Sequence, residues 1–418
     1  MVSIKQFACL VFGGLVVLLT GTRANAQSTC TRSDTLPTGT SPTWYVSVAS
    51  SEHADSQRTQ VFGRTCTLTE VTQSKRLRIR VRQAPGTYPA IYNVVTRNRN
   101  ELYVFGGNAG QSSGAYVARL DPETLVELWR TPLRVSAGQW SYLGVMAVHG
   151  NGFLYAVTSN LLVKLNPTTG AILASLALPQ LPADKGGTGA AYNGFVVTAD
   201  GLIVTKSIER GPCTADGPQG LFCAIDNRLP STLAVVDPGT LRLLAATTLS
   251  EPSLGRLMSE KHDGIDYIYI PGVSALTRYT WVNNTLALDS GWGPVGYDGG
   301  TSPSGLGLLG SFVVGQTNIV PSVTPTRVFA VNIFDGSQVY HLQPFVGLSS
   351  SWVPSKGVFD TVNSRLYVQD TAAAQVAAID LTPTGLQLAW KVENRATGFM
   401  ALLGPSSARQ ISMPAFSA

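Results

Sequence analysis

The stretch Val163-Lys-Leu-Asn166-Pro167-Thr-Thr-Gly170 is the clearest copy of a pattern that recurs along the chain. Residues 118–125 and 235–241 repeat it closely, and residues 331–336 and 379–385 are looser copies. Each copy combines an apolar strand, a turn and the start of a second apolar strand. In the close copies, proline at the second turn position fixes φ and the preceding Asp or Asn caps the turn. The pattern therefore predicts a series of β-hairpins.

A second kind of hairpin precedes these, with an apolar strand, a polar turn and a strand that contains an aromatic residue. Examples are residues 92–105, 145–157, 192–204, 257–270 and 356–368. Two consecutive hairpins make a four-stranded sheet, and such units begin near residues 88, 142, 191, 254, 305 and 353. Four-stranded units that recur at roughly 40–50 residues are typical of a β-propeller.

We therefore predict an all-β, seven-bladed β-propeller of four-stranded blades over residues 88–418, with six or eight blades as alternatives. Residues 399–404 and 411–416 supply about two strands of the last blade. The segment 27–87 is expected to add strands to that closing blade, from residues 68–81, with residues 44–48 as a second candidate. Strands from both termini would then remove the free sheet edge of an open ring.

The composition agrees with this fold class. Of 418 residues, 44% are hydrophobic and only 13% are charged, with 42 Gly and 24 Pro. Charged residues make up about a quarter of an ordinary soluble domain. Few charges and many glycines indicate short strands and turns, and they argue against an all-helical protein.

The first 26 residues are interpreted as a signal peptide. Lys5 precedes an apolar run over residues 7–19, and Ala24-Asn25-Ala26 provides a small-residue cleavage site. No later segment approaches the about 20 apolar residues of a spanning helix. The sequence therefore predicts a secreted or periplasmic protein without a membrane span.

The charge balance does not favour nucleic acid as a partner. Without residues 1–26 the chain has 28 basic and 25 acidic residues, whereas nucleic-acid binding requires clustered Lys and Arg. The densest basic run, residues 75–82, alternates basic and apolar residues. This alternation predicts an edge strand protected by its charges, with contact to an anionic surface as the alternative.

Four cysteines follow the signal segment: Cys30, Cys66, Cys213 and Cys223. An even number in an exported chain predicts two disulfides with three possible connectivities, and proximity favours Cys30–Cys66 and Cys213–Cys223. Neither pair has the short spacing of a zinc site. His149 and His262 fall in turns of inner hairpins and His341 on an outer strand, so the histidines are not expected to converge and we expect no metal site.

A family resemblance follows from the repeat. The repeat resembles quinoprotein-like and YVTN-type propeller repeats over about residues 88–400. The features that carry the resemblance are a strand of the type Leu102-Tyr103-Val104, the Asp-Pro hairpin and an outer strand with Trp. Quinoprotein alcohol dehydrogenases and lactonase-like hydrolases share this architecture. The resemblance implies two enzyme alternatives, an oxidoreductase that uses pyrroloquinoline quinone (PQQ) and a lactonase-like hydrolase. The chain has no adjacent Cys-Cys pair of the kind that the large quinoprotein dehydrogenases carry.

The predicted ligand site lies on the face where the innermost strands begin. Long loops gather there, and the loop 207–231 contains Cys213 and Cys223, so it is predicted to be a tethered lid. The candidate ligand-binding residues are Tyr92, Asn93, Tyr142, Tyr192, Asn193, Arg256, Ser304 and Lys356 at strand starts, with Trp140, Lys185, Trp352 and Arg395 from adjoining loops.

Aromatic walls with a few cations suit a small polar or anionic ligand. Our hypothesis is an extracytoplasmic, monomeric propeller that binds such a ligand, or another extracytoplasmic protein, on this face. In the enzyme alternatives, Arg256, Lys356, Lys185 and Arg395 would pair with the carboxylates of PQQ or with an oxyanion. In the structural alternative, the aromatic residues are wedges between blades and the cations are solvated. The substrate is not predicted.

Overall fold

The computed structural model describes residues 37–63, 83–107, 114–134, 139–142, 144–215, 217–297, 303–317, 326–348, 356–394, 400–404, 406 and 409–412. Within these residues the strands form seven sheets. Most of the strands follow one another in antiparallel order within a sheet, as a series of hairpins requires.

The first three sheets have four strands each. The first contains β2 (Ile91–Thr96), β3 (Leu102–Gly107), β4 (Ala115–Leu120) and β5 (Glu127–Leu133). The second contains β6 (Val145–Val148), β7 (Leu154–Thr158), β8 (Leu161–Leu165) and β9 (Ile172–Ala177). The third contains β10 (Ala190–Val197), β11 (Ile203–Glu209), β12 (Thr232–Asp237) and β13 (Arg242–Thr248).

The next three sheets repeat this order. The fourth contains β14 (Met258–His262), β15 (Ile265–Pro271), β16 (Ala275–Val282) and β17 (Thr285–Leu288), and β18 (Val295–Gly296) also pairs with β16. The fifth contains β19 (Pro303–Leu309), β20 (Phe312–Thr317), β21 (Arg327–Asn332) and β22 (Val339–Leu342). The sixth contains β23 (Val358–Asp360), β24 (Arg365–Asp370), β25 (Gln375–Thr382) and β26 (Gly385–Glu393).

The seventh sheet joins distant parts of the chain. In it, β1 (Val61–Phe62) pairs in parallel with β27 (Ala401–Leu403), which pairs with β28 (Gln410–Ser412). Residues 68–81, which we expected to contribute here, lie outside the described residues. Trp44, from the other expected strand, instead forms an isolated bridge with His149. The number of blades and the closure of the ring stay predictions.

The outer hairpins form through the predicted turn chemistry. Asn166 Oδ1 accepts hydrogen bonds from the backbone N–H groups of Thr168 and Thr169, at 2.8 and 3.2 Å. Asp237 Oδ1 does the same for Gly239 and Thr240, at 2.6 and 3.3 Å. Gly170 has a φ of +74°, a conformation that glycine adopts without steric cost.

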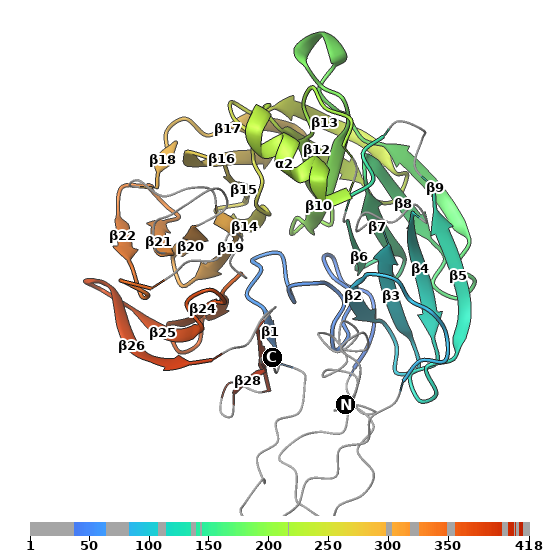
Figure 1. Cartoon of the computed structure of the whole chain (residues 1–418), viewed down its shortest axis with the longest axis horizontal. Coiled ribbons are helices and arrows are strands. Elements are labelled where there is room, and N and C mark those ends of the chain that lie inside the picture. The colour runs from blue at the N-terminus through green and yellow to red at the C-terminus, as the bar shows by residue number, and fades with distance from the viewer. Residues whose placement is uncertain are drawn as a thin grey trace, which may run out of the picture.

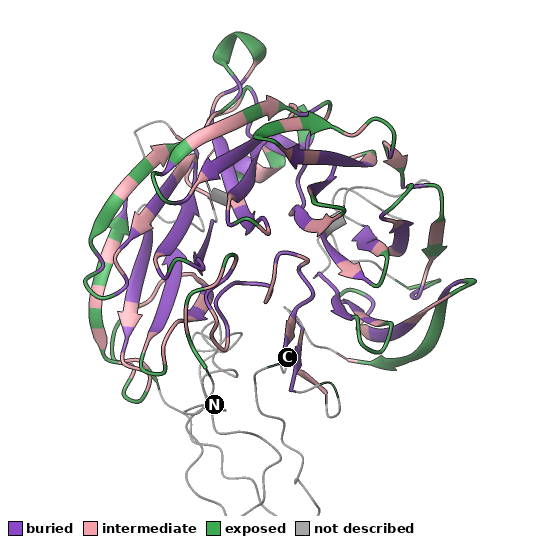
Figure 2. Ribbon diagram, turned by 180° about the vertical axis from the view of Figure 1, so that it is seen from behind, coloured by how far each residue is buried: buried purple, intermediate pink, exposed green. Residues whose placement is uncertain are grey.

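The core lies between adjacent sheets. The middle strands of the sheets are largely buried, whereas the outermost strands consist mostly of partly buried and exposed residues (Figure 2). Tyr103 in β3 donates a hydrogen bond to the carbonyl of Pro167 in the next sheet's turn, at 3.1 Å. Tyr155 in β7 donates to the carbonyl of Pro238 in the sheet after that, at 2.6 Å. The repeated tyrosine and the repeated turn therefore tie neighbouring sheets together.

The N-terminal part of the chain runs through the middle of the sheets, as the blue segment in Figure 1 shows. We call residues 49–60 the axial segment. Its carbonyl groups accept hydrogen bonds of 2.7–3.1 Å from the backbone N–H groups of Thr96, Val148, Ser259, Leu308, Phe359 and Leu402. Ser56 Oγ donates to the carbonyl of Val197 in β10. The axial segment thus contacts the first strand of six sheets and β27 of the seventh.

Candidate functional site

Two predicted site residues, Tyr92 and Arg256, meet at a carboxylate of the axial segment. The Tyr92 hydroxyl donates to Glu52 Oε1 at 2.7 Å, and it accepts a hydrogen bond from Arg256. Arg256 also pairs with Glu52 Oε2, and its guanidinium lies 5.1 Å from the centre of the Tyr92 ring. Burial raises the pKa of Tyr92, so its hydroxyl remains protonated.

Arg58 of the axial segment is the most unusual member of the site. Only 3% of its surface is exposed, and its Nε and Nη2 atoms have no hydrogen-bond partner. Its ion-pair partner is Glu52, whose Oε2 atom lies 3.9 Å from Nη2 of Arg58. Burial lowers the pKa of Arg58 to about 9, so the group is still charged at neutral pH. A buried charged donor without a partner is costly.

A small pocket adjoins Arg58. It has no room for a water molecule in this structure, and its lining residues are Arg58, Asn193, Gly194, Phe195, Lys206, Arg256 and Leu257. Asn193 and Arg256 are partly exposed, and the other five are buried. The pocket therefore combines a deep cationic wall with a side that reaches the surface.

Two lysines lie close to this arrangement. Lys206 in β11 is 1% exposed and Lys356 is 5% exposed. Burial, followed by the charge of Arg58, lowers the pKa of both ammonium groups well below the ordinary value. Lys356 donates to the carbonyls of Arg58 and Gly357, so this predicted ligand residue also holds the axial segment in place.

Of the remaining predicted residues, those that the structure describes do not line the pocket. Asn93 is fully buried and binds the backbone of Met146 through both ends of its amide, at 2.8 and 3.1 Å. Tyr192 is buried and donates to the carbonyl of Pro179. Lys185 is exposed at the end of a short 3-10 helix, Ala183–Lys185. Ser304 lies in β19, and Trp352 and Arg395 lie outside the described residues.

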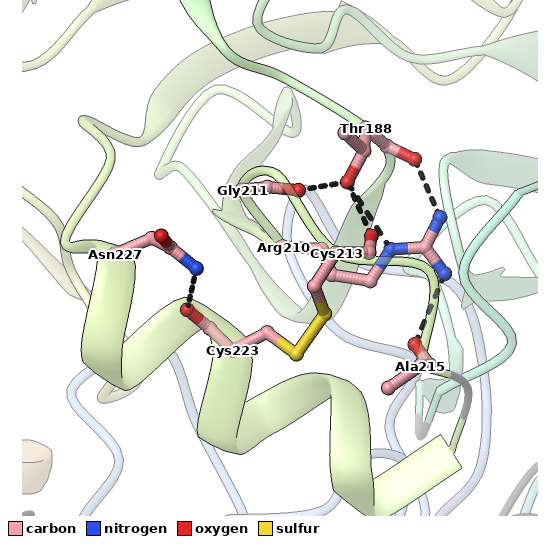
Figure 3. Close-up of a disulfide and its surroundings, with 7 residues drawn as sticks. All are labelled: Thr188, Arg210, Gly211, Cys213, Ala215, Cys223 and Asn227. Carbon is pink, nitrogen blue, oxygen red and sulfur yellow. Dashed lines mark hydrogen bonds between the residues drawn. A yellow bond between two sulfur atoms is a disulfide. The ribbon is translucent and has the colours of Figure 1, made fainter.

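The loop predicted as a lid contains a helix that the sequence analysis did not foresee, α2 (Gly217–Asn227). Cys213 and Cys223 form a disulfide with a Cα–Cα distance of 6.3 Å (Figure 3). Arg210 binds the carbonyls of Thr188 and Ala215 beside it. The predicted Cys213–Cys223 pairing is confirmed, whereas Cys30 and Cys66 lie outside the described residues.

Trp140 packs against this helix from below. It is fully buried, packs with Ala191, Ile208 and Ala224, and stacks on Tyr142 with ring centres 4.8 Å apart. A Cβ atom at Gly220 of α2 would lie 2.3 Å from Trp140 Nε1, so the helix needs glycine there. These two predicted aromatic residues therefore pack under α2, and Trp140 is a core residue of this region.

Three residues of the site were not predicted: Glu52, Arg58 and Lys206. Glu52 and Arg58 belong to a segment expected to supply only blade strands. Lys206 carried a usable signal, because it is a single charged residue within the otherwise uncharged run Ile203-Val-Thr-Lys206-Ser-Ile208. Unpaired charged residues are rare in the interior of a protein.

Among the residues that the structure describes, no three His, Cys, Asp or Glu side chains gather closely enough to hold a metal ion. Within the same residues, none of the helices has the length and apolarity needed to cross a membrane.

Comparison with known proteins bears on the fold. No protein-family model and no curated protein matches the chain. Among solved structures, the quinohemoprotein alcohol dehydrogenase ADHIIG from Pseudomonas putida HK5 is 10% identical with a TM-score of 0.52, over 78% of this chain and 62% of that chain. The chain has a β-propeller fold. It spans about 62% of the length of that dehydrogenase.

Two further structures are similar at lower scores. The periplasmic gluconolactonase PpgL of Pseudomonas aeruginosa is 15% identical with a TM-score of 0.45, over 75% of this chain and 85% of that chain. A putative 6-phosphogluconolactonase from Bacteroides uniformis is 16% identical with a TM-score of 0.41, over 72% and 84% of the two chains.

Proposed function

We propose that the protein binds a small carboxylate in the pocket beside the axial segment. The observation that carries this proposal is the guanidinium of Arg58, which is buried and has two N–H-bearing nitrogens without a partner. A carboxylate can accept two parallel hydrogen bonds from one guanidinium. Arg256 lines the same pocket and adds a second positive charge. Asn193, also on the wall, provides an amide that helps to select a polar ligand.

The pocket has no room for a water molecule as the structure stands, so a ligand can enter only if the lining side chains move apart. PQQ, a fused three-ring compound with three carboxylates, does not fit this space. Dye reduction with added PQQ tests the oxidoreductase alternative, and lactone hydrolysis tests the lactonase-like alternative.

We also propose that the protein works outside the cytoplasm. The signal-like pattern of residues 1–26 supports this location. The Cys213–Cys223 disulfide supports it too, because structural disulfides persist in oxidising compartments. Seven blades with β1 closing the last one remain our proposal for the ring, supported by the seven sheets and the pairing of β1 with β27. We expect a monomer, and a protein partner on this face is the alternative ligand.

Thermal unfolding with added sodium acetate, lactate or phosphate tests the binding proposal, with sodium chloride as the ionic-strength control. A ligand at one hundred times its Kd stabilises the folded state by about 2.7 kcal/mol. We expect a carboxylate to raise the Tm of the wild-type protein. The Arg58→Met variant should show no such rise. In the absence of ligand it should unfold at an equal or higher temperature, because two buried nitrogens without hydrogen-bond partners are gone and Glu52 keeps its pair with Arg256.

The matched control is Arg242→Met, which removes an exposed arginine of β13 and should leave the response intact. No rise in the wild-type protein, or an equal rise in Arg58→Met, would show that this pocket is not an anion site.

A further inference from the structure

One acceptor pattern for N-linked sugars occurs in the sequence, and the proposed site makes no use of it. N-glycosylation requires Asn, then any residue except Pro, and then Ser or Thr. Asn283-Asn284-Thr285 is the one stretch of the 418 residues that meets this requirement. Asn166-Pro167-Thr168 has the same spacing, but its middle proline excludes it. The folded chain can carry a glycan only where the asparagine is accessible.

Asn283 and Asn284 form the turn between β16 and β17. Val282 and Thr285 pair across this turn, and the two asparagines have φ values of +50° and +57°. Two consecutive residues with positive φ are typical of a type I′ hairpin turn, and asparagine is one of the few residues that adopt this conformation readily. The local sequence therefore specifies a tight turn at the tip of a hairpin.

The side chains of this turn are available for modification. Asn283, Asn284 and Thr285 are all exposed. Among the residues that the structure describes, the Asn283 amide has no hydrogen-bond partner, whereas Asn166 Oδ1 accepts two backbone hydrogen bonds from its own turn. Thr285 Oγ1 donates to the carbonyl of Asn283 at 3.4 Å. The hydroxyl group that the acceptor pattern requires therefore lies beside the asparagine.

The turn leads into an exposed edge of the fourth sheet. Its strand β17 lies at the end of the order β14-β15-β16-β17, and Figure 1 shows β17 on the outer side of the sheet and β14 on the inner side. Three of the four residues of β17 are exposed, and Leu288 is 49% exposed. Exposed edge strands can pair with other chains. A bulky hydrated group at the start of β17 would hinder such pairing without reaching the pocket beside Arg58.

We infer that Asn283 is the attachment site of an N-linked glycan. The inference rests on the proposed extracytoplasmic location, because glycans of this kind are added to exported chains. The donor is an oligosaccharide that is linked through a diphosphate to a lipid. The Asn283 Nδ2 atom forms a bond to C1 of the first sugar, and the bond between C1 and the diphosphate oxygen breaks. One amide proton passes to the medium, the lipid diphosphate leaves, and nothing is oxidised or reduced.

The test is secretion of the full chain, with its own residues 1–26, from cultured eukaryotic cells. The secreted protein is treated with a peptide N-glycosidase, which removes an N-linked glycan and converts its asparagine to aspartate. We expect the intact mass to fall by that of one glycan, and peptide mapping to find the new aspartate at position 283. A secreted protein without a glycan, or with a glycan at another residue, overturns the inference and leaves the location standing. An unglycosylated chain that stays in the cytosol overturns both.

Two glycine substitutions form a matched pair. Glycine adopts positive φ without steric cost, so Asn283→Gly and Asn284→Gly both preserve the turn. We expect Asn283→Gly to lose the glycan completely and Asn284→Gly to retain it, since the second change leaves the acceptor pattern intact. Thr285→Val keeps a β-branched residue in the strand and removes the hydroxyl group, so it should also lose the glycan. A glycan that persists in Asn283→Gly, or disappears in Asn284→Gly, refutes the assignment.

Discussion

Glu209 makes the stability of this protein depend on pH near neutrality. It lies in β11 and is 1% exposed. Its Oε1 accepts a hydrogen bond from Ser207 Oγ at 2.6 Å, and the backbone of Leu181 also interacts with the carboxyl group. Burial raises the pKa of this carboxyl group to about 7, and the Ser207 hydroxyl opposes that effect only in part. The folded protein therefore prefers the protonated form.

The size of the effect follows from the two pKa values. The carboxyl group has an ordinary pKa of 4.5 and a folded pKa of about 7. Each pKa unit corresponds to about 1.4 kcal/mol, so ionisation costs the folded state roughly 3 kcal/mol. Because the folded pKa is raised, the contribution to stability is complete below about pH 4.5. It is lost as the pH rises through about 7.

Glu209→Gln keeps the shape of the side chain but cannot ionise. We expect the variant and the wild-type protein to have similar free energies of unfolding at pH 5, and the variant to be more stable by roughly 3 kcal/mol at pH 8.5. Unfolding in guanidinium chloride at the two pH values measures this difference. The other titrating groups are the same in both proteins, so their contributions cancel when the two free energies are subtracted. The control Glu123→Gln changes an exposed residue and should show the same difference at both pH values. A Glu209→Gln difference that does not change with pH would refute the reasoning.

Two further changes test structural assignments. Asn93→Ala should lower the free energy of unfolding by about 2–4 kcal/mol, because the N–H and C=O groups of Met146 lose their partners; calorimetry measures this, and an unaltered Tm would contradict it. The same variant should keep its response to acetate, whereas a lost response would make Asn93 a ligand residue. Replacing both Cys213 and Cys223 by Ser should weaken the closed loop by about 2–3 kcal/mol, seen as faster tryptic cleavage at Arg228, and an unchanged cleavage rate would argue against it.

Much of the fold was predictable because hairpin formation is local. The Asn166 and Asp237 side chains cap turns within three residues of themselves, so the residue types alone specify the geometry. The repeat of Tyr103 and Tyr155 was also visible, although its role was not. Their hydroxyl groups reach turns of the following sheet, and this contact depends on how sheets pack.

The site was less predictable because its contacts join distant parts of the chain. Glu52 pairs with Arg256 across 204 positions, and residues 49–60 have no hairpin pattern that would place them on the axis. Tyr92, Asn193, Arg256 and Lys356 were found because they lie at or near the starts of inner strands. The same rule included Asn93 and Tyr192, whose side chains bind backbone groups of the protein interior.

The axial segment explains how two nitrogens of a buried arginine can remain without hydrogen-bond partners. Six of its carbonyl groups accept hydrogen bonds from strands of different sheets, so its path is fixed by backbone contacts. The position of Arg58 therefore does not depend on the interactions of its own charge. Folding itself supplies the free energy that desolvates and positions this charge. A ligand that binds such a preorganised donor loses less free energy to reorganisation. By this argument, ligand preference depends on residues 52–58 as much as on the strands around them.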